Sequence, residues 1–235
     1  MCTLTFAPLG TKQVITINRD EAPERRADDP VIRERSGKQL WLAPEPVSGS
    51  SNVVFDIINH RLVVLLNGAF ESHEHKPPYR LSRGLVILDS FDYDSLGAMK
   101  RLYDFTGIEP FTLLAFQKGA TEEMRWDGEK VHYTDPAAHQ FTIWSSAKLY
   151  PAEVIQSREE AFADWLKKNQ RIYAQQLFDM HQREGDDSRG PGFRMNYEDL
   201  VKTVSITQFT LSGNRVALRY LDLMRRPAQL MERVF

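Results

Sequence analysis

The first 21 residues read MCTLTFAPLGTKQVITINRDE, and this stretch decides how the fold is interpreted. Residues 2–6 and 14–17 are short runs of apolar and β-branched side chains, which are typical of strands. The segment between them contains the turn formers Pro8 and Gly10. The stretch therefore predicts a β-hairpin at the start of the chain.

The register of this hairpin sets the position of the only cysteine, Cys2. With a turn centred near Leu9 and Gly10, paired residue numbers sum to about 19, which predicts Cys2 opposite Ile17. The charged tetrad Asn18-Arg19-Asp20-Glu21 follows directly. The hairpin is therefore expected to bring the tetrad to the N-terminus.

Cys2 is a candidate nucleophile because it follows Met1, which is usually removed before a small residue. Removal would leave one residue with a thiol and an α-amine that can accept its proton. Arg19 near the sulfur would favour the reactive thiolate, and Asp20 could hold the new ammonium group. Nucleophile and base would then be the same residue.

Each of these residues also has a purely structural interpretation. A cysteine near a terminus can be a small, half-buried apolar group, and the tetrad can be a polar turn in which Arg19 and Asp20 pair in solvent. Side chains alternate across a regular strand, so Arg19 and Asp20 are expected to point to opposite sides. Asn67 precedes Gly68 and is either a turn residue or an amide that hydrogen-bonds an oxyanion.

The rest of the chain predicts strands, helices, strands, a long helix and a closing hairpin. Residues 22–36 are expected to be a surface excursion without regular structure. Strands are expected over residues 40–43, 53–58, 62–66, 111–116, 124–126, 131–133, 141–144, 203–211 and 215–223, and helices over 82–91, 95–105 and 151–181. This order predicts the α+β class, as an αββα sandwich of two mainly antiparallel sheets between helical layers, in one domain spanning residues 1–235.

The composition argues against several classes of protein. The chain has 30 basic and 32 acidic residues, so its net charge of -2 predicts no nucleic-acid partner. Its longest apolar run, residues 62–66, is strand-sized, and no membrane insertion is expected. A lone cysteine cannot form an internal disulfide, and the charged start of the chain is unlike a secretory signal, which together predict a cytoplasmic protein.

The histidines and glycines indicate no cofactor. His73 and His75 alternate around Glu74 and could share one face of an extended segment, which is a weak metal signal, but a short pair without a third ligand is more often a solvated loop, here before Pro77-Pro78. The sequence has no phosphate-binding glycine loop, no dinucleotide fingerprint and no serine-esterase motif. We therefore expect neither a metal nor a cofactor.

Several short motifs occur in a fixed order along the chain: Met1-Cys2, Asn18-Arg19-Asp20-Glu21, Leu66-Asn67, Ser82-Arg83-Gly84, Ile143-Trp144-Ser145-Ser146-Ala147 and Thr203-Val204-Ser205-Ile206-Thr207-Gln208. Together they resemble the NRDE family, also called transport and Golgi organisation proteins, over most of the chain. The resemblance implies the N-terminal nucleophile hydrolase fold with Cys2 as nucleophile. It further implies that Arg19 and Asp20 lie at the active site, with Asn67 in the oxyanion hole and with Asn18, Arg83 and Ser146 as substrate-binding candidates.

Two functions follow as expectations. The first is a cysteine hydrolase that cleaves the carbon–nitrogen bond of a small amide through an acyl-thioester. The alternative is a non-catalytic protein that holds haem or a lipid-like acyl compound in the same cleft, with cysteine or histidine as the iron ligand. The sequence leaves the substrate and the oligomeric state open.

Overall fold

The computed structural model describes residues 2–117, 119–185 and 191–235. Over these residues the fold is mixed α+β, with two antiparallel sheets and four α-helices. The chain divides into two compact units: the first comprises Met1–Arg26, His139–Ser145 and Tyr150–Phe235, and the second comprises Ala27–Ala138 and Ser146–Leu149. The α+β class is confirmed. The sandwich and the single domain over residues 1–235 stay predictions.

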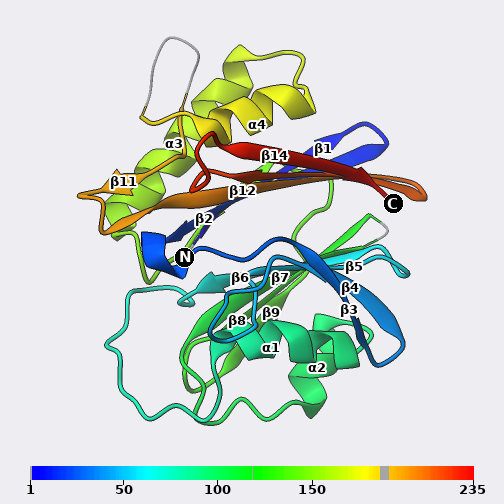
Figure 1. Cartoon of the computed structure of the whole chain (residues 1–235), viewed down its shortest axis with the longest axis vertical. Helices are drawn as coiled ribbons and strands as arrows, with labels where there is room; N and C mark the ends of the chain where they lie inside the picture. The colour runs from blue at the N-terminus through cyan, green and yellow to red at the C-terminus, as the bar shows by residue number, and fades with distance from the viewer. Residues whose placement is uncertain (1, 118, 186–190) are drawn as a thin grey trace. The chain divides into compact units, whose positions relative to one another are not determined.

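The first unit is built on a sheet in the order β10-β1-β2-β12-β13-β14, with β11 paired to β12. Its strands are β1 (Cys2–Leu9), β2 (Lys12–Glu21), β10 (Thr142–Ser145), β11 (Asn196–Tyr197), β12 (Val201–Ser212), β13 (Arg215–Asp222) and β14 (Gln229–Val234). The helices α3 (Ala152–Lys168) and α4 (Ala174–Gln182) lie on one side of this sheet, as Figure 1 shows. The closing hairpin is confirmed as β12–β13, whereas β14 had no counterpart in the prediction.

The first hairpin is confirmed, but its predicted register is wrong by two residues. Leu9 pairs with Lys12, so the turn consists of Gly10 and Thr11, and Cys2 pairs with Arg19 rather than with Ile17. Gly10 has a φ of +65°, a conformation that glycine adopts without steric cost and that a two-residue hairpin turn requires. The turn therefore lies closer to β2 than the breaker residues suggested.

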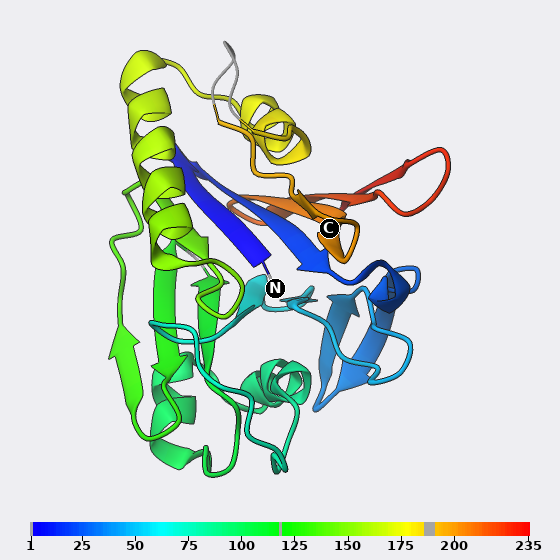
Figure 2. The same cartoon turned by 90° about the vertical axis from the view of Figure 1, so that its left-hand side faces the viewer.

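The single helix predicted over residues 151–181 is wrong, because the chain breaks it into α3 and α4. The side-chain amide of Asn169 donates to the carbonyl of Trp165 at 2.7 Å, which satisfies an open carbonyl in the last turn of α3. The backbone N–H of Tyr173 then donates to the side-chain oxygen of Gln176 at 2.9 Å, which satisfies an open donor at the start of α4. Both helices bury apolar side chains against the sheet, in a cluster that includes Ala7, Val14, Phe162, Trp165, Leu177 and Met180. Figure 2 shows α3 beside the strands of the first hairpin.

The second unit is an antiparallel sheet in the order β3-β4-β5-β6-β7-β8-β9. Its elements are β3 (Val31–Arg35), β4 (Lys38–Leu42), β5 (Val53–Asp56), β6 (Arg61–Asn67), α1 (Arg83–Asp89), α2 (Leu96–Leu102), β7 (Phe111–Gln117), β8 (Ala120–Trp126) and β9 (Val131–Thr134), with short 3-10 turns at Pro23–Arg25 in the first unit and Ser90–Asp92 here. Its core joins the sheet to α1 and α2 through residues such as Leu65, Val86, Phe91, Met99 and Phe111. The predicted strands over residues 40–133 are thus confirmed within a few residues.

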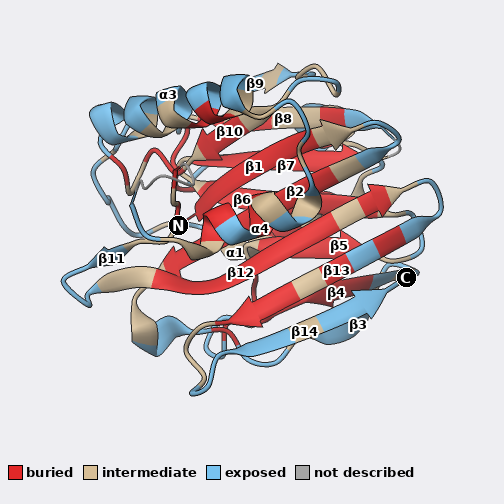
Figure 3. Cartoon of the chain, turned by 90° about the horizontal axis from the view of Figure 1, so that it is seen from above, coloured by how far each residue is buried: buried red, intermediate tan, exposed pale blue. Residues whose placement is uncertain are grey.

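The surface excursion predicted over residues 22–36 is wrong for its second half, which forms β3. This strand is at the edge of its sheet and is largely exposed, because charged residues occupy most of it. Such an edge strand lacks the apolar alternation that reveals inner strands. Figure 3 shows the contrast between exposed β3 and β14 and the mostly buried β1, β2, β6 and β12.

Candidate active site

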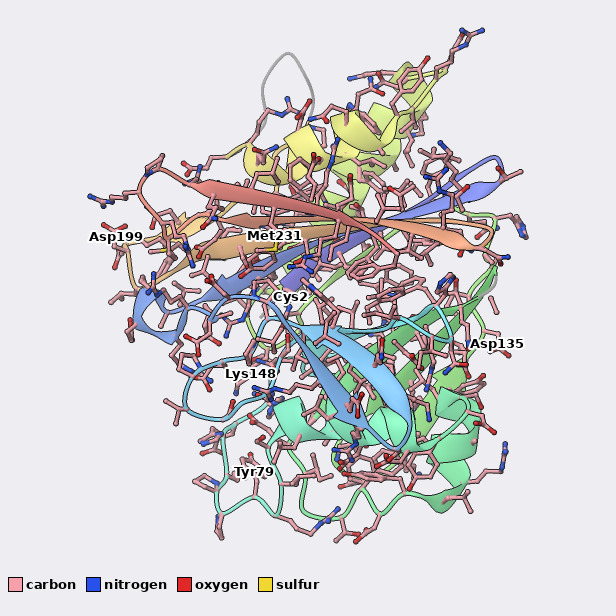
Figure 4. All side chains as sticks on the ribbon, turned by 45° about the vertical axis from the view of Figure 1, so that its right-hand side comes forward. Cys2, Tyr79, Asp135, Lys148, Asp199 and Met231 are labelled. Atoms are coloured by element: carbon pink, nitrogen blue, oxygen red, sulfur yellow. The ribbon has the colours of Figure 1, made fainter. Side chains whose placement is uncertain are left out.

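Cys2 opens β1, and its closest neighbour across the sheet is Arg19. The two residues pair directly between β1 and β2, and Arg19 in turn pairs with Ser205 of β12. Paired residues place their side chains on the same face, with Cβ atoms about 5 Å apart. A thiol, a guanidinium and a hydroxyl therefore belong to one row across three adjacent strands. Cys2 is labelled in Figure 4 and is fully buried.

The Arg19 side chain is held by the chain that follows β2. Its Nη1 donates to the carbonyl of Arg25 at 2.7 Å, and only 9% of the residue is exposed. The short 3-10 turn Pro23–Arg25 supplies this carbonyl. A cation fixed by a charge-assisted hydrogen bond keeps a defined position on its face of the sheet.

Asp20 faces the opposite side of the sheet from Arg19, as strand alternation requires. Its Oδ2 accepts from the Tyr150 hydroxyl at 2.7 Å and its Oδ1 accepts from the Thr203 hydroxyl at 2.6 Å. Burial raises the pKa of Asp20, while these two hydrogen bonds and the charge of Arg158 oppose that rise. The carboxyl group therefore lies buried at the end of the hairpin at which β1 begins.

A bulge in β12 lies beside one of the two partners of Asp20. Thr203 pairs with Asp20 and Ser205 pairs with Arg19, so Val204 is an extra residue in β12. A bulge bends its strand and re-aims the neighbouring side chains. Thr203 also accepts from the backbone N–H of Met195 at 3.0 Å, which ties the segment before β11 to the same carboxyl group.

Arg158 of α3 completes this network. Its Nη1 donates to the Thr3 hydroxyl at 2.5 Å, and its guanidinium lies 4.1 Å from the centre of the Tyr150 ring. Tyr150, Arg158 and Thr203 were all missed in the sequence reasoning. Thr203 alone carried a signal, because it belongs to one of the short motifs from which the resemblance to the NRDE family was predicted.

Asn18, predicted to bind substrate, has every polar group of its side chain engaged inside the first unit. Its amide nitrogen donates to the carbonyls of His181 and Phe193, at 3.1 and 2.9 Å. Its oxygen accepts from Nδ1 of His181 at 2.8 Å, and Nε2 of the same ring accepts from the Thr5 hydroxyl at 2.8 Å. These contacts give Asn18 a structural role, and its contact with substrate stays a prediction.

His181 is a neutral, buried ring in this arrangement. Burial, aided by the positive charge of Arg158, lowers the pKa of His181 to about 3. The hydrogen bonds fix the tautomer with the proton on Nδ1, because Asn18 presents its oxygen there. His181 therefore fastens α4 to β1 and β2, and the sequence analysis assigned it no role.

Asn67 ends β6 in the second unit, where its carbonyl anchors the segment of residues 146–148. The hydroxyl of Ser146 and the backbone N–H of Lys148 donate to that carbonyl at 2.6 and 3.2 Å. Gly68 has a φ of +86°, and a Cβ there would lie 2.8 Å from the Lys148 nitrogen, so the close approach requires glycine. The Asn67 side-chain amide makes no hydrogen bond to another residue that the structure describes. Ser146 is fully buried and acts here as an anchor.

Arg83, the remaining substrate-binding candidate, opens α1 and binds Glu109. Its Nη2 lies 3.0 Å from Oε2 of Glu109, while His73 and His75 contact Oε1 at 2.9 and 3.3 Å. Burial would raise the pKa of Glu109, but Arg83 and the two histidines together hold it below its usual range. The expected solvated loop is therefore wrong for His73, which is held against a buried carboxylate.

The described residues contain no group of three or more histidine, cysteine, aspartate or glutamate side chains placed to hold a metal ion. Within the same residues, no helix is long and apolar enough to cross a membrane. Comparison of the sequence with models of known protein families gives no match, and comparison with curated proteins gives no significant match either. The resemblance to the NRDE family stays a prediction.

Proposed function

We propose that this chain is a cysteine N-terminal nucleophile hydrolase, with the αββα arrangement of that fold, acting on the amide bond of a small molecule. The observation that carries the proposal is the direct pairing of Cys2 with Arg19. It places the only thiol of the chain beside a cation that is itself held in position. Cations favour the thiolate, which is the nucleophilic form.

Acylation needs two proton transfers, and it exchanges the carbon–nitrogen bond of the substrate for a carbon–sulfur bond. After removal of Met1, the α-amine of Cys2 takes the thiol proton, and the sulfur attacks the carbonyl carbon of the substrate. The tetrahedral intermediate then collapses, the carbon–nitrogen bond breaks, and the ammonium returns its proton to the leaving amine. The acyl group remains on Cys2 as a thioester.

In deacylation water is the nucleophile and the Cys2 thiolate is the leaving group. The α-amine takes a proton from water, the hydroxide attacks the thioester, and the thiolate leaves and is reprotonated. The products are a carboxylic acid and an amine. No metal, oxidant or cofactor enters either step.

Asp20 is proposed to stabilise the ammonium form of the α-amine, because it is a buried carboxyl group at the start of the hairpin. Burial alone disfavours its charge, so an ammonium group beside it would restore the ionised form. Tyr150 and Thr203 orient the carboxyl group through one oxygen each. Asn67, in the second unit, keeps its predicted role as oxyanion donor, with its amide free of other hydrogen bonds to described residues.

The test uses protein whose loss of Met1 is verified by intact mass, assayed on a panel of short-chain and arylacetyl p-nitroanilides. The expected result is turnover in the natural chain and a loss of about 10³-fold or more in Cys2→Ala. A second variant with one glycine inserted before Cys2 keeps the thiol but moves the α-amine away, and it should be equally inactive. Because Cys2 is the only cysteine, iodoacetamide labelling reports on this sulfur alone and verifies that the inserted chain still presents it.

Full turnover by Cys2→Ala would overturn the proposal, because no other thiol is present. Full turnover by the glycine-inserted chain would show that the α-amine is not the base. In that case another group would have to accept the proton of the Cys2 thiol.

A further inference from the structure

The first hairpin has a second end, and a hollow lies there. The β1–β2 turn and the connection between α3 and α4, together with Phe141 and Thr210, line a hollow of about 780 Å³. This volume falls in the range of small-molecule sites. The turn of the hairpin is separated from Cys2 by the length of β1, roughly 25 Å for its eight residues. The hollow is therefore separate from the row that contains the thiol.

The wall of the hollow is apolar. Leu9, Phe141, Leu166 and Ile172 line it while packing against the buried cluster beneath α3 and α4, and each remains partly accessible. Tyr173 adds an aromatic side chain and is 59% exposed. Partly exposed apolar side chains that share a concave site offer favourable burial to a ligand.

The charges around the hollow have one sign. Lys12 and Arg171 are its ionisable cations, and no aspartate or glutamate lines it. Neither cation forms an ion pair with a residue in the described part of the chain. Asn169 also lines the hollow, but its side chain is neutral and its amide nitrogen already donates to the carbonyl of Trp165. It therefore does not offset the two positive charges. A ligand that complements this lining therefore has a negatively charged group attached to an apolar body.

We propose that this hollow binds a small amphipathic organic monoanion, such as an arylalkyl carboxylate. The carboxylate lies between Lys12 and Arg171, and the ring packs on Phe141, Ile172 and Tyr173. Arginine pairs with carboxylates in a planar, two-point geometry, and aromatic rings stack favourably on one another. The site does not depend on chemistry at Cys2.

The test is calorimetric titration with 4-phenylbutanoate and with its neutral match, 4-phenylbutanamide. The carboxylate should bind the natural chain, and the amide should bind about tenfold more weakly, because two partly exposed ion pairs each contribute modestly. The double variant Lys12→Gln/Arg171→Gln should lose the same tenfold. The matched control Lys167→Gln/Lys168→Gln removes two positive charges from the nearby end of α3, outside the lining, and should bind as the natural chain does.

A separate variant tests the apolar wall. Ile172→Ser should weaken both ligands by a similar factor, because it removes a contact that does not depend on charge. Cys2→Ala should bind the carboxylate unchanged. Absence of carboxylate binding, equal affinity for carboxylate and amide, equal loss in the two double variants, or loss of binding in Cys2→Ala would each overturn the proposal.

Discussion

The two faces of the first hairpin use polar side chains in opposite ways. The face under α3 and α4 carries Thr3, Thr5, Asn18 and Asp20, and every one of them is hydrogen-bonded to a partner far away in sequence. The other face carries Cys2 and Arg19 together with Leu4, Phe6, Ile15 and Ile17. On the first face polar groups fasten helices to strands, whereas on the second a thiol and a cation stand among apolar side chains.

The comparison shows that adjacency in sequence does not imply a shared task. Arg19 and Asp20 are neighbours in the tetrad, yet the sheet separates their side chains. A buried polar group that is fully paired stabilises the fold and is expensive to disturb. If stability and thiol reactivity divide between the two faces in the same way, changes on the helix-facing side should alter stability and changes on the other face should alter the reactivity of Cys2.

The largest effect is expected from Asn18→Ala, on the helix-facing side. The change removes three hydrogen bonds and leaves two carbonyls and the His181 ring proton buried without partners. The free energy of unfolding should fall by about 3 kcal/mol, measured by urea denaturation. The rate at which iodoacetamide labels Cys2 in the folded protein should change less than about twofold. A tenfold change in the labelling rate at unchanged stability would contradict this prediction, because it would mean that Asn18 controls the reactivity of Cys2 rather than the stability of the fold.

The second prediction concerns the loss of stability at acidic pH that is caused by His181. His181 titrates near 6.5 when unfolded but near 3 in the folded chain, so between these values the unfolded state binds more protons. Its contribution to stability is complete well above pH 6.5 and is lost as the pH falls, so that it is about 2 kcal/mol smaller at pH 5. In His181→Gln this part of the slope should vanish. Parallel curves for the two proteins would contradict a neutral, buried ring.

A smaller effect is expected from Arg19→Gln, and it should appear in the reactivity of the thiol rather than in stability. Loss of the cation opposite Cys2 should slow iodoacetamide labelling at pH 7 by about tenfold, because less thiolate forms. The stability should change by no more than about 1 kcal/mol. Arg25→Gln, at an exposed side chain nearby, is the matched control and should label normally. Equal labelling rates in all three proteins would mean that Arg19 does not act on the sulfur.

The smallest effect is expected from Thr203→Val, which keeps the shape of the side chain but removes its hydroxyl. One oxygen of Asp20 and the N–H of Met195 each lose a partner. The free energy of unfolding should fall by about 1 kcal/mol, whereas Thr203→Ser should remain close to the natural chain. If the serine variant is as unstable as the valine variant, the methyl group rather than the hydroxyl stabilises this position.

Much of the fold was predictable because local signals were strong. Alternating apolar runs between turn formers revealed most inner strands. The helix expected over residues 95–105 is found as α2, which Ser95 caps. The break between α3 and α4 was missed because Ile172 and Tyr173 continue the apolar spacing across it. The edge strands β3 and β14 were missed because exposed, charged strands carry little periodic signal.

The candidate site was predictable only in part, for a related reason. Cys2 and Arg19 were found because the hairpin joining them is local. The partners of Asp20 are 130 and 183 residues away along the chain, at Tyr150 and Thr203. No short sequence pattern predicts such contacts, because they depend on how the segment before α3 and the strand β12 pack on the first hairpin.

By itself the sequence determined that Cys2 and Arg19 share a face. The predicted and observed registers differ by two residues, and a shift of two keeps every side chain on its side of the sheet. Tertiary structure alone decided that Arg19 rather than Ile17 lies opposite the thiol, and that Asp20 is buried against Tyr150. The physical reason is range: strand alternation is encoded residue by residue, whereas turn geometry and helix packing select the exact partners.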